Sequence, residues 1–165
     1  MSEWITGYFA GLNENLAIFL VSMLPVVELR GAIPFGVSLG VDWRSVYLIS
    51  VIGNMIPVPF IILFFRPLIN YLKGTRLFGG IATKIHERSL KKSKDVVKYK
   101  IFGLFLFVMI PLPGTGAWTG SAIAALLDIR LRNAIPTILL GVLCAGILMM
   151  GISYGFGTLF VHFFG

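Results

Sequence analysis

The sequence predicts an all-α integral membrane protein whose two halves form an inverted repeat. Each half is expected to be a re-entrant helical hairpin followed by a transmembrane helix. Three observations predict this fold class: an apolar composition, a segment that recurs at a fixed offset, and one polybasic stretch between the two copies.

The composition places the chain in a membrane. Hydrophobic residues make up 57% of it and charged residues 13%, with a mean hydropathy of +0.91, whereas soluble domains have about 45–50% apolar and about 25% charged residues. We therefore expect a single membrane domain over residues 1–165. It divides into a first repeat (about 15–65), a basic connector (66–100) and a second repeat (about 101–155).

The repeat is visible as paired interruptions of apolar segments. Three pairs share an offset of 86 residues without a gap: Pro25 with Pro111, Asp42 with Asp128, and Arg44 with Arg130. Paired proline and glycine interruptions in two halves of a membrane protein indicate a binding site near the bilayer midplane.

In the first half, we expect residues 1–11 to form a short helix at the membrane interface. Leu16–Leu24 and Gly31–Val41 are apolar but shorter than the ~20 residues of a full crossing, and Pro25 separates them, so they form the first re-entrant hairpin. Ser45–Phe65 is long enough to cross, and its prolines indicate a bent helix that faces the protein interior.

In the second half, Tyr71–Lys100 is polar with apolar residues at helical spacing, which indicates an amphipathic helix on the membrane surface. Ile101–Ile110 and Ala117–Leu127 are expected to form the second hairpin. Ala134–Met150 is then the second crossing.

Charge placement sets the orientation. Nine of the 14 Lys and Arg residues lie between Lys73 and Lys100, so the positive-inside rule makes this connector cytoplasmic and argues against a nucleic-acid partner. The first hairpin then opens outward and the second inward, with their tips meeting near the midplane. The expected partners are the lipid bilayer and anionic lipid headgroups, and the sequence leaves a monomer and a homodimer both open.

Glu28 and Arg30 are the only ionisable residues between Glu14 and Asp42, and both lie at the first tip. A charge at membrane depth costs at least about 2.5–3.5 kcal/mol, so it faces a partner or a wet cavity. One interpretation is a structural pair in an extended segment. In the other, Arg30 anchors an anionic headgroup and Glu28 carries protons, because a desolvated carboxylate takes up a proton more readily. The two roles can coexist.

The second tip carries no charge. Its glycines leave backbone N–H groups accessible where a new helix starts, which suits an anion, although small residues also allow two hairpins to pack closely. The candidate substrate-binding residues of both tips and the first crossing are Glu28, Arg30, Gly31, Pro34, Asn54, Pro113, Gly114, Thr115, Gly116, Trp118 and Thr119.

Other functional classes receive less support. Asp42 and Asp128 each precede a predicted helix, where Asp is a common N-cap. No pair of His residues has metal-ligand spacing, and neither a phosphate-binding loop nor a hydrolase motif is present. We therefore expect no metal, no cofactor and no enzymatic activity, and any transport must be secondary.

The segment from Val27 to Pro34, together with that from Pro111 to Trp118, resembles the small multidrug export protein family over roughly Leu16 to Gly155. The architecture is also similar to that of the DedA membrane proteins. DedA proteins are associated with proton-linked movement of polyprenyl phosphate or other lipid headgroups. The resemblance implies a DedA-like fold and a small transporter or flippase with its site between the two hairpins, and it does not imply which substrate is moved. In DedA proteins the arginines lie on the second hairpin, whereas here Glu28 and Arg30 share the first.

The resulting function hypothesis is a secondary transporter or lipid flippase in the cell membrane. It would move an anionic or amphiphilic substrate, such as a polyprenyl or phospholipid phosphate, with Glu28 coupling transport to protons. Two alternatives remain: a small exporter of lipophilic drugs, and a non-transporting factor that binds anionic lipid or a partner through its basic connector.

Overall fold

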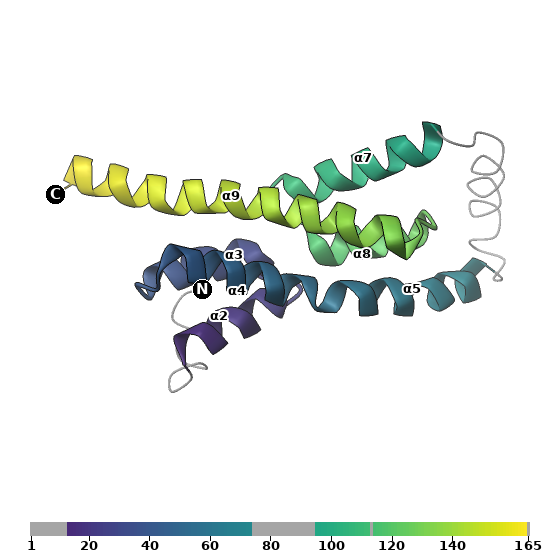
Figure 1. The fold of residues 1–165 in the computed structure, drawn as a ribbon, viewed down its shortest axis with the longest axis horizontal. Helices are drawn as coiled ribbons and strands as arrows, with labels where there is room; N and C mark the ends of the chain where they lie inside the picture. The colour runs from purple at the N-terminus through teal and green to yellow at the C-terminus, as the bar shows by residue number, and fades with distance from the viewer. Residues whose placement is uncertain (1–12, 74–94, 113, 165) are drawn as a thin grey trace.

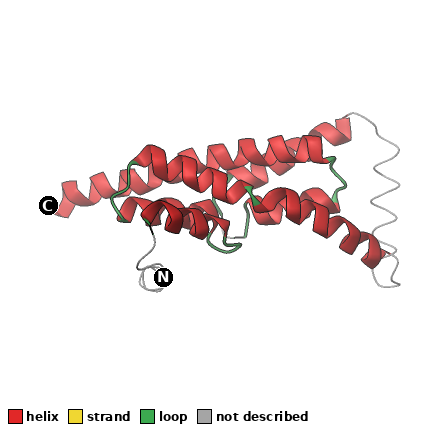
Figure 2. Ribbon diagram, turned by 60° about the horizontal axis from the view of Figure 1, so that its bottom comes forward, coloured by secondary structure: helices red, strands yellow, loops and turns green. Residues whose placement is uncertain are grey.

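The computed structural model describes residues 13–73, 95–112 and 114–164, and within them every regular element is a helix (Figures 1 and 2). The helices are α2 (Glu14–Met23), α3 (Glu28–Ser38), α4 (Trp43–Met55), α5 (Pro57–Lys73), α7 (Asp95–Met109), α8 (Ala117–Leu126) and α9 (Leu131–Phe164). The interfacial helix expected over residues 1–11 lies outside these ranges.

Apart from α4 and α5, which follow one another in a single apolar segment, four helices are too short to cross a membrane, and each half contains two of them in succession. α2 has 10 residues, α3 has 11, α7 has 15 and α8 has 10, so none reaches the ~20 residues of a full crossing. Pro25 and Pro111 lie in the breaks that separate them. The predicted pairs of short helices are therefore present, with α3 beginning at Glu28 and not, as expected, at Gly31.

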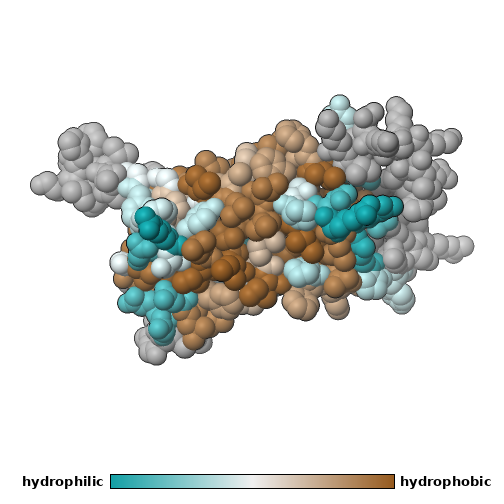
Figure 3. Space-filling view, viewed as in Figure 1, coloured by the Kyte–Doolittle hydropathy of each residue, from teal (hydrophilic) through white to brown (hydrophobic). Residues whose placement is uncertain are grey.

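Two longer apolar segments meet the requirements of membrane spans, Trp43–Leu68 and Leu131–Gly155, each with a mean hydropathy of 2.3. Only 39% and 33% of their most apolar windows are buried, whereas the core helix of a soluble protein would be largely enclosed. Their exposed apolar residues contribute to an apolar band across the middle of the face seen in Figure 3, with polar residues gathered towards both ends of that face. This distribution is consistent with a membrane protein.

The first span is interrupted where its prolines predict. α4 ends at Met55 and α5 starts at Pro57, because Pro57 and Pro59 have no N–H to donate to the carbonyls of Gly53 and Met55. The second span has no such break, since α9 continues through Pro136 to Phe164.

The short helices pack against the helices of the two spans. α2 and α3 pack on α4, and α7 packs on α9, while α3 also contacts α9 and α5 contacts α8. The α2–α3 pair and the α7–α8 pair extend from the centre towards opposite ends of the molecule (Figure 1). Both chain breaks therefore lie in the centre, where they meet.

The offset of 86 describes only the start of the repeat. α7 ends 86 residues after α2, at Met109 against Met23, but α9 begins 88 residues after α4, at Leu131 against Trp43. The second break is longer than the first, so the pairing of Asp42 with Asp128 does not match the helix starts.

The two aspartates accordingly differ in their roles. Asp42 caps α4, its Oδ2 accepting from the Arg44 N–H at 3.1 Å, as predicted. Asp128 has a φ of 53° and lies in the turn after α8, where its N–H bonds the Ala125 carbonyl at 3.1 Å. Its position resembles that of Gly40 after α3, which has a φ of 75°. Asp128 thus ends a helix, and its expected role as an N-cap was wrong.

The predicted connector is partly helical at its edges. Residues 66–73 continue α5 and residues 95–100 belong to α7, so the two helices extend into the range assigned to the loop. The remainder of the expected surface helix, 74–94, lies outside the described residues.

Candidate functional site

Glu28 is the first residue of α3 and is only 5% exposed. Its carboxylate reaches the start of α8, where Oε1 accepts from the Trp118 N–H at 3.0 Å and Oε2 from the Ala117 N–H at 3.3 Å. A helix N-terminus has unsatisfied N–H groups and a partial positive charge. Glu28 therefore serves as a capping carboxylate for a helix in the other half of the chain.

The contact explains two unusual backbone conformations. Glu28 has a φ of 50°, which costs a non-glycine residue about 1–2 kcal/mol and turns the chain sharply after Pro25. Gly116, which precedes α8 and offers no side-chain cap, has a φ of 139°. A Cβ on Gly116 would lie 2.0 Å from Glu28 Oε2, so only glycine leaves room for the carboxylate.

Arg30 binds the opposite kind of backbone group. Its Nη1 donates to the carbonyls of Leu112, at 2.5 Å, and Thr115. Its Nη2 donates to Ile110 at 3.1 Å and lies 3.5 Å from the Val108 carbonyl. Val108 lies in the last turn of α7 and the other three residues follow its end, where a helix leaves carbonyls without intrahelical partners. The planar guanidinium thus supplies N–H donors to the backbone carbonyls of the second break.

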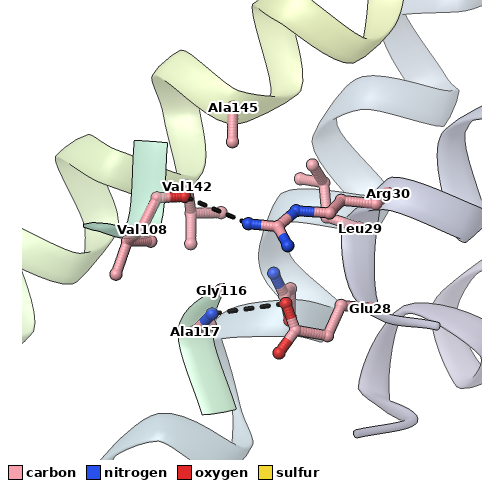
Figure 4. Close-up of a pocket in the computed structure, with 9 residues that line it drawn as sticks. Glu28, Leu29, Arg30, Val108, Gly116, Ala117, Val142 and Ala145 are labelled. Carbon is pink, nitrogen blue, oxygen red and sulfur yellow. Dashed lines mark hydrogen bonds between the residues drawn. The ribbon is translucent and has the colours of Figure 1, made fainter. Parts of the chain in front are cut away.

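The two charges therefore lie side by side but bind different groups (Figure 4). Glu28 satisfies N–H groups at the start of α8, and Arg30 satisfies carbonyls after the end of α7. We call this arrangement the crosswise caps. The pair is not extended as the sequence interpretation assumed, since α3 already begins at Glu28.

A small pocket lies beside the crosswise caps, with room for about one water molecule. It brings together four of the predicted residues, Glu28, Arg30, Asn54 and Gly116. The remaining lining residues are Leu29, Val108, Ala117, Val142 and Ala145 (Figure 4). Val142 and Ala145 come from α9 and were not predicted, because an apolar residue facing a pocket is indistinguishable in sequence from one facing lipid.

Asn54 supplies an unused polar group at this pocket. It lies near the end of α4, is only 2% exposed, and its buried Oδ1 has no hydrogen-bond partner. Buried polar atoms normally have partners. The structure places Asn54 at the pocket, with this oxygen available to a ligand.

The remaining predicted residues do not line the pocket. Thr115 Oγ1 is 2.8 Å from the Ile110 carbonyl oxygen and holds the second break in shape. Trp118 is anchored by its N–H, while its buried indole Nε1 has no partner. Gly31 and Pro34 lie within α3, and Gly114 and Thr119 are exposed near the start of α8. Pro113 lies outside the described residues.

Within the described ranges, no group of three or more His, Cys, Asp or Glu side chains is placed to hold a metal ion. The pocket's chemistry thus consists of one carboxylate, one guanidinium engaged with carbonyls, and one amide oxygen.

A comparison with family models gives one match. The family described as "Putative small multi-drug export protein" matches residues 28–148, a range that begins at Glu28 and covers both chain breaks and most of α9. No curated protein and no solved structure matches the chain.

Proposed function

This chain belongs to the small multi-drug export family, and we propose that it is a secondary membrane exporter of amphiphilic, drug-like cations. The observation that carries the proposal is the burial of Glu28 where two broken helices meet. The carboxylate is held by two backbone N–H groups of α8, and a change in its charge acts on both halves at once.

The engagement of Arg30 favours a cation over an anion as substrate. Its Nη atoms face the carbonyls of the second break, so the guanidinium is occupied as a structural donor. Glu28 and Asn54 offer acceptor oxygens at the pocket. A site that presents oxygens suits a proton or the positive end of a lipophilic cation.

Proton coupling follows from the cap. An ionised Glu28 accepts charge-assisted hydrogen bonds from the start of α8, and these are roughly twice as strong as neutral ones. When a proton binds one carboxylate oxygen, the charge is lost and the cap weakens. Protonation therefore loosens α8 relative to α3, and deprotonation restores the contact. This gives two states whose balance a proton gradient can shift.

We place the protein in the cell membrane as a multi-pass chain with inverted hairpins. Arg66 Nη2 donates to the Ile129 carbonyl at 2.5 Å and Lys100 Nζ to the Leu127 carbonyl at 3.3 Å, so both lie at the end of the molecule where α8 ends. Arg130 and Arg132 are exposed next to them. The positive-inside rule assigns this end to the cytoplasm. The end that carries Asp42 then faces outside.

A lipid flippase is the second candidate. The start of α8 already holds a carboxylate, so it could hold a phosphate when Glu28 withdraws. Under this alternative, Glu28 and the lipid headgroup would compete for the N–H groups of Ala117 and Trp118.

Proteoliposomes separate the candidates. With an imposed pH gradient, we expect transport of ethidium, a lipophilic cation, and a loss of about 10²-fold or more in Glu28→Gln, the range of a lost proton-transfer group. Glu14→Gln is the matched control, because Glu14 is exposed at the start of α2.

Each outcome is decisive. Ethidium flux equal to that of empty liposomes would refute export, and full flux in Glu28→Gln would refute coupling through this carboxylate. Movement of a fluorescent phospholipid without movement of ethidium would replace the exporter with the flippase.

A further inference from the structure

α4 carries two buried polar side chains on one face that the crosswise caps do not use. Ser50 is fully buried, Asn54 is 2% exposed, and both Ser50 Oγ and Asn54 Oδ1 have no hydrogen-bond partner. Residues four apart on a helix are neighbours on the same face. The two groups therefore form a short polar line that ends at the pocket beside Glu28.

Ser50 differs from other buried hydroxyl residues of the chain. Ser22, Ser121 and Thr137 each donate to a carbonyl of their own helix, at 2.7, 2.6 and 2.6 Å. A helical serine can satisfy itself locally in this way. Ser50 does not, so its hydroxyl is available to another partner.

The helix break adds acceptors beside Asn54. Pro57 and Pro59 cannot donate to the carbonyls of Gly53 and Met55, which flank Asn54 in sequence. In membrane proteins, carbonyls freed in this way are satisfied by neighbouring groups or ordered water and often contribute to ion sites. The amide oxygen and these carbonyls make the end of α4 rich in acceptors.

The charged side chains at the pocket form a neutral set. Arg30 and Glu28 are the charged residues that line the pocket, and their charges cancel. The contributions of α4, α7, α8 and α9 are uncharged: Asn54, Val108, Gly116, Ala117, Val142 and Ala145. The interior admits groups the size of water, and a polar site of that size suits a water molecule with two or more polar partners.

We propose that Asn54 binds a water molecule beside the Glu28 carboxylate and that Ser50 extends this line by one helical turn, so that protons reach and leave Glu28 along α4. The water passes a proton to a carboxylate oxygen and takes one from the Ser50 hydroxyl, directly or through a second water, and water that enters from outside returns a proton to Ser50. The Asn54 amide oxygen accepts a hydrogen bond from the water and holds it in place. This inference rests on the proposed role of Glu28 as the coupling carboxylate.

The direction of the line agrees with export. From Asn54 it runs back along α4 towards Trp43 and the end that carries Asp42, which the proposed orientation places outside. An exporter that uses inward proton movement must load protons from that side. The line covers one helical turn of that distance; beyond Ser50, the next residue on the same face of α4 is Val46, which is apolar and fully buried.

The test follows proton exchange at Glu28 itself and does not depend on any drug. In reconstituted full-length protein brought to acidic pH, the infrared band of the protonated Glu28 carboxyl is identified by its loss in Glu28→Gln. Its shift after transfer to D₂O then reports the exchange rate. We expect Asn54→Leu, which fills the water site, to slow exchange by about tenfold or more, equivalent to about 1.4 kcal/mol on the barrier.

Ser50→Ala removes one unpartnered oxygen and should leave folding intact, so it serves as the second variant. We expect it to slow exchange by a smaller factor. Ser121→Ala is its matched control, because Ser121 is equally buried but bonds its own helix, and it should exchange at the wild-type rate.

Wild-type exchange in Asn54→Leu would overturn the water site, and wild-type exchange in Ser50→Ala would overturn the extension along α4. The absence of any Glu28 band at all pH values tested would instead remove the coupling role, and this inference with it. A protein that fails to move ethidium but shows slowed exchange in both variants would lose the proposed export function while retaining this proton path.

Discussion

Gly116→Ala should disrupt the contact between the Glu28 carboxylate and the start of α8. The new Cβ would lie 2.0 Å from Glu28 Oε2 and 2.7 Å from its Cδ, distances at which something must move. Glu28 is held by its position at the start of α3, so the carboxylate is pushed off the N–H groups of Ala117 and Trp118. Gly114→Ala is a matched control, because Gly114 also has a positive φ, 81°, but an added Cβ there meets nothing within 4 Å.

The two substitutions should lower the free energy of unfolding by different amounts. Both place alanine at a positive φ. At Gly114 this costs about 1–2 kcal/mol, and at Gly116, whose φ of 139° and ψ of −169° fall in a region that essentially only glycine adopts, it costs about 1–3 kcal/mol. Gly116→Ala also removes hydrogen bonds to a buried charge, worth about 1.5–3 kcal/mol. The expected loss in the free energy of unfolding is thus about 1–2 kcal/mol for Gly114→Ala and about 2.5–6 kcal/mol for Gly116→Ala.

Unfolding in mixed micelles, followed by circular dichroism, measures both losses. A double-mutant cycle with Glu28→Ala should show that Gly116→Ala costs no more than its backbone strain once the carboxylate is gone. Equal losses for Gly114→Ala and Gly116→Ala in the otherwise wild-type protein would refute the reasoning, because they would show that the Glu28 contact adds nothing to stability.

Three further substitutions test neighbouring contacts by the same unfolding measurement. Arg30→Lys should lose about 1–3 kcal/mol, because an ammonium cannot reproduce the fork that serves the carbonyls of the second break; an unchanged value would show that these carbonyls need no guanidinium. Gly53→Ala should destabilise, since its Cβ would lie 2.0 Å from Ser22 Oγ, whereas Gly103→Ala, with open space around it, should stabilise by up to about 1 kcal/mol; the opposite order would contradict the packing of α2 on α4. Asp42→Ala should lose about 1 kcal/mol through its helix cap, and no loss would mean that the cap is redundant.

The sequence was sufficient to predict the order of the helices and the two breaks, because proline and short apolar length act locally. It also identified Glu28, Arg30, Asn54 and Gly116, since charged or polar residues in apolar segments and glycines before a helix are visible without a structure. These four residues lie together at the pocket.

What sequence could not predict depends on contacts between distant segments. Glu28 binds N–H groups and Arg30 binds carbonyls, across sequence separations of 89 and 82 residues. How α3 and α8 approach each other determines these partners. Asp128 was misassigned because a longer second break moved the start of α9 by two positions relative to the repeat. Matching identical residues at one fixed offset cannot detect this shift in where the helix begins.

The crosswise caps also bear on how the chain matures as it is made. The first half leaves the ribosome before the second, and it carries both charged residues. Until Glu28 and Arg30 are in place, the second break would expose N–H and carbonyl groups to lipid, each costing several kcal/mol. The half that is synthesised first thus supplies the partners that the polar backbone groups of the second half need. In a circularly permuted protein whose second half is synthesised first, that break would stay exposed until the first half follows. Such a protein should give a lower yield of folded chain, although its folded structure would contain the same contacts.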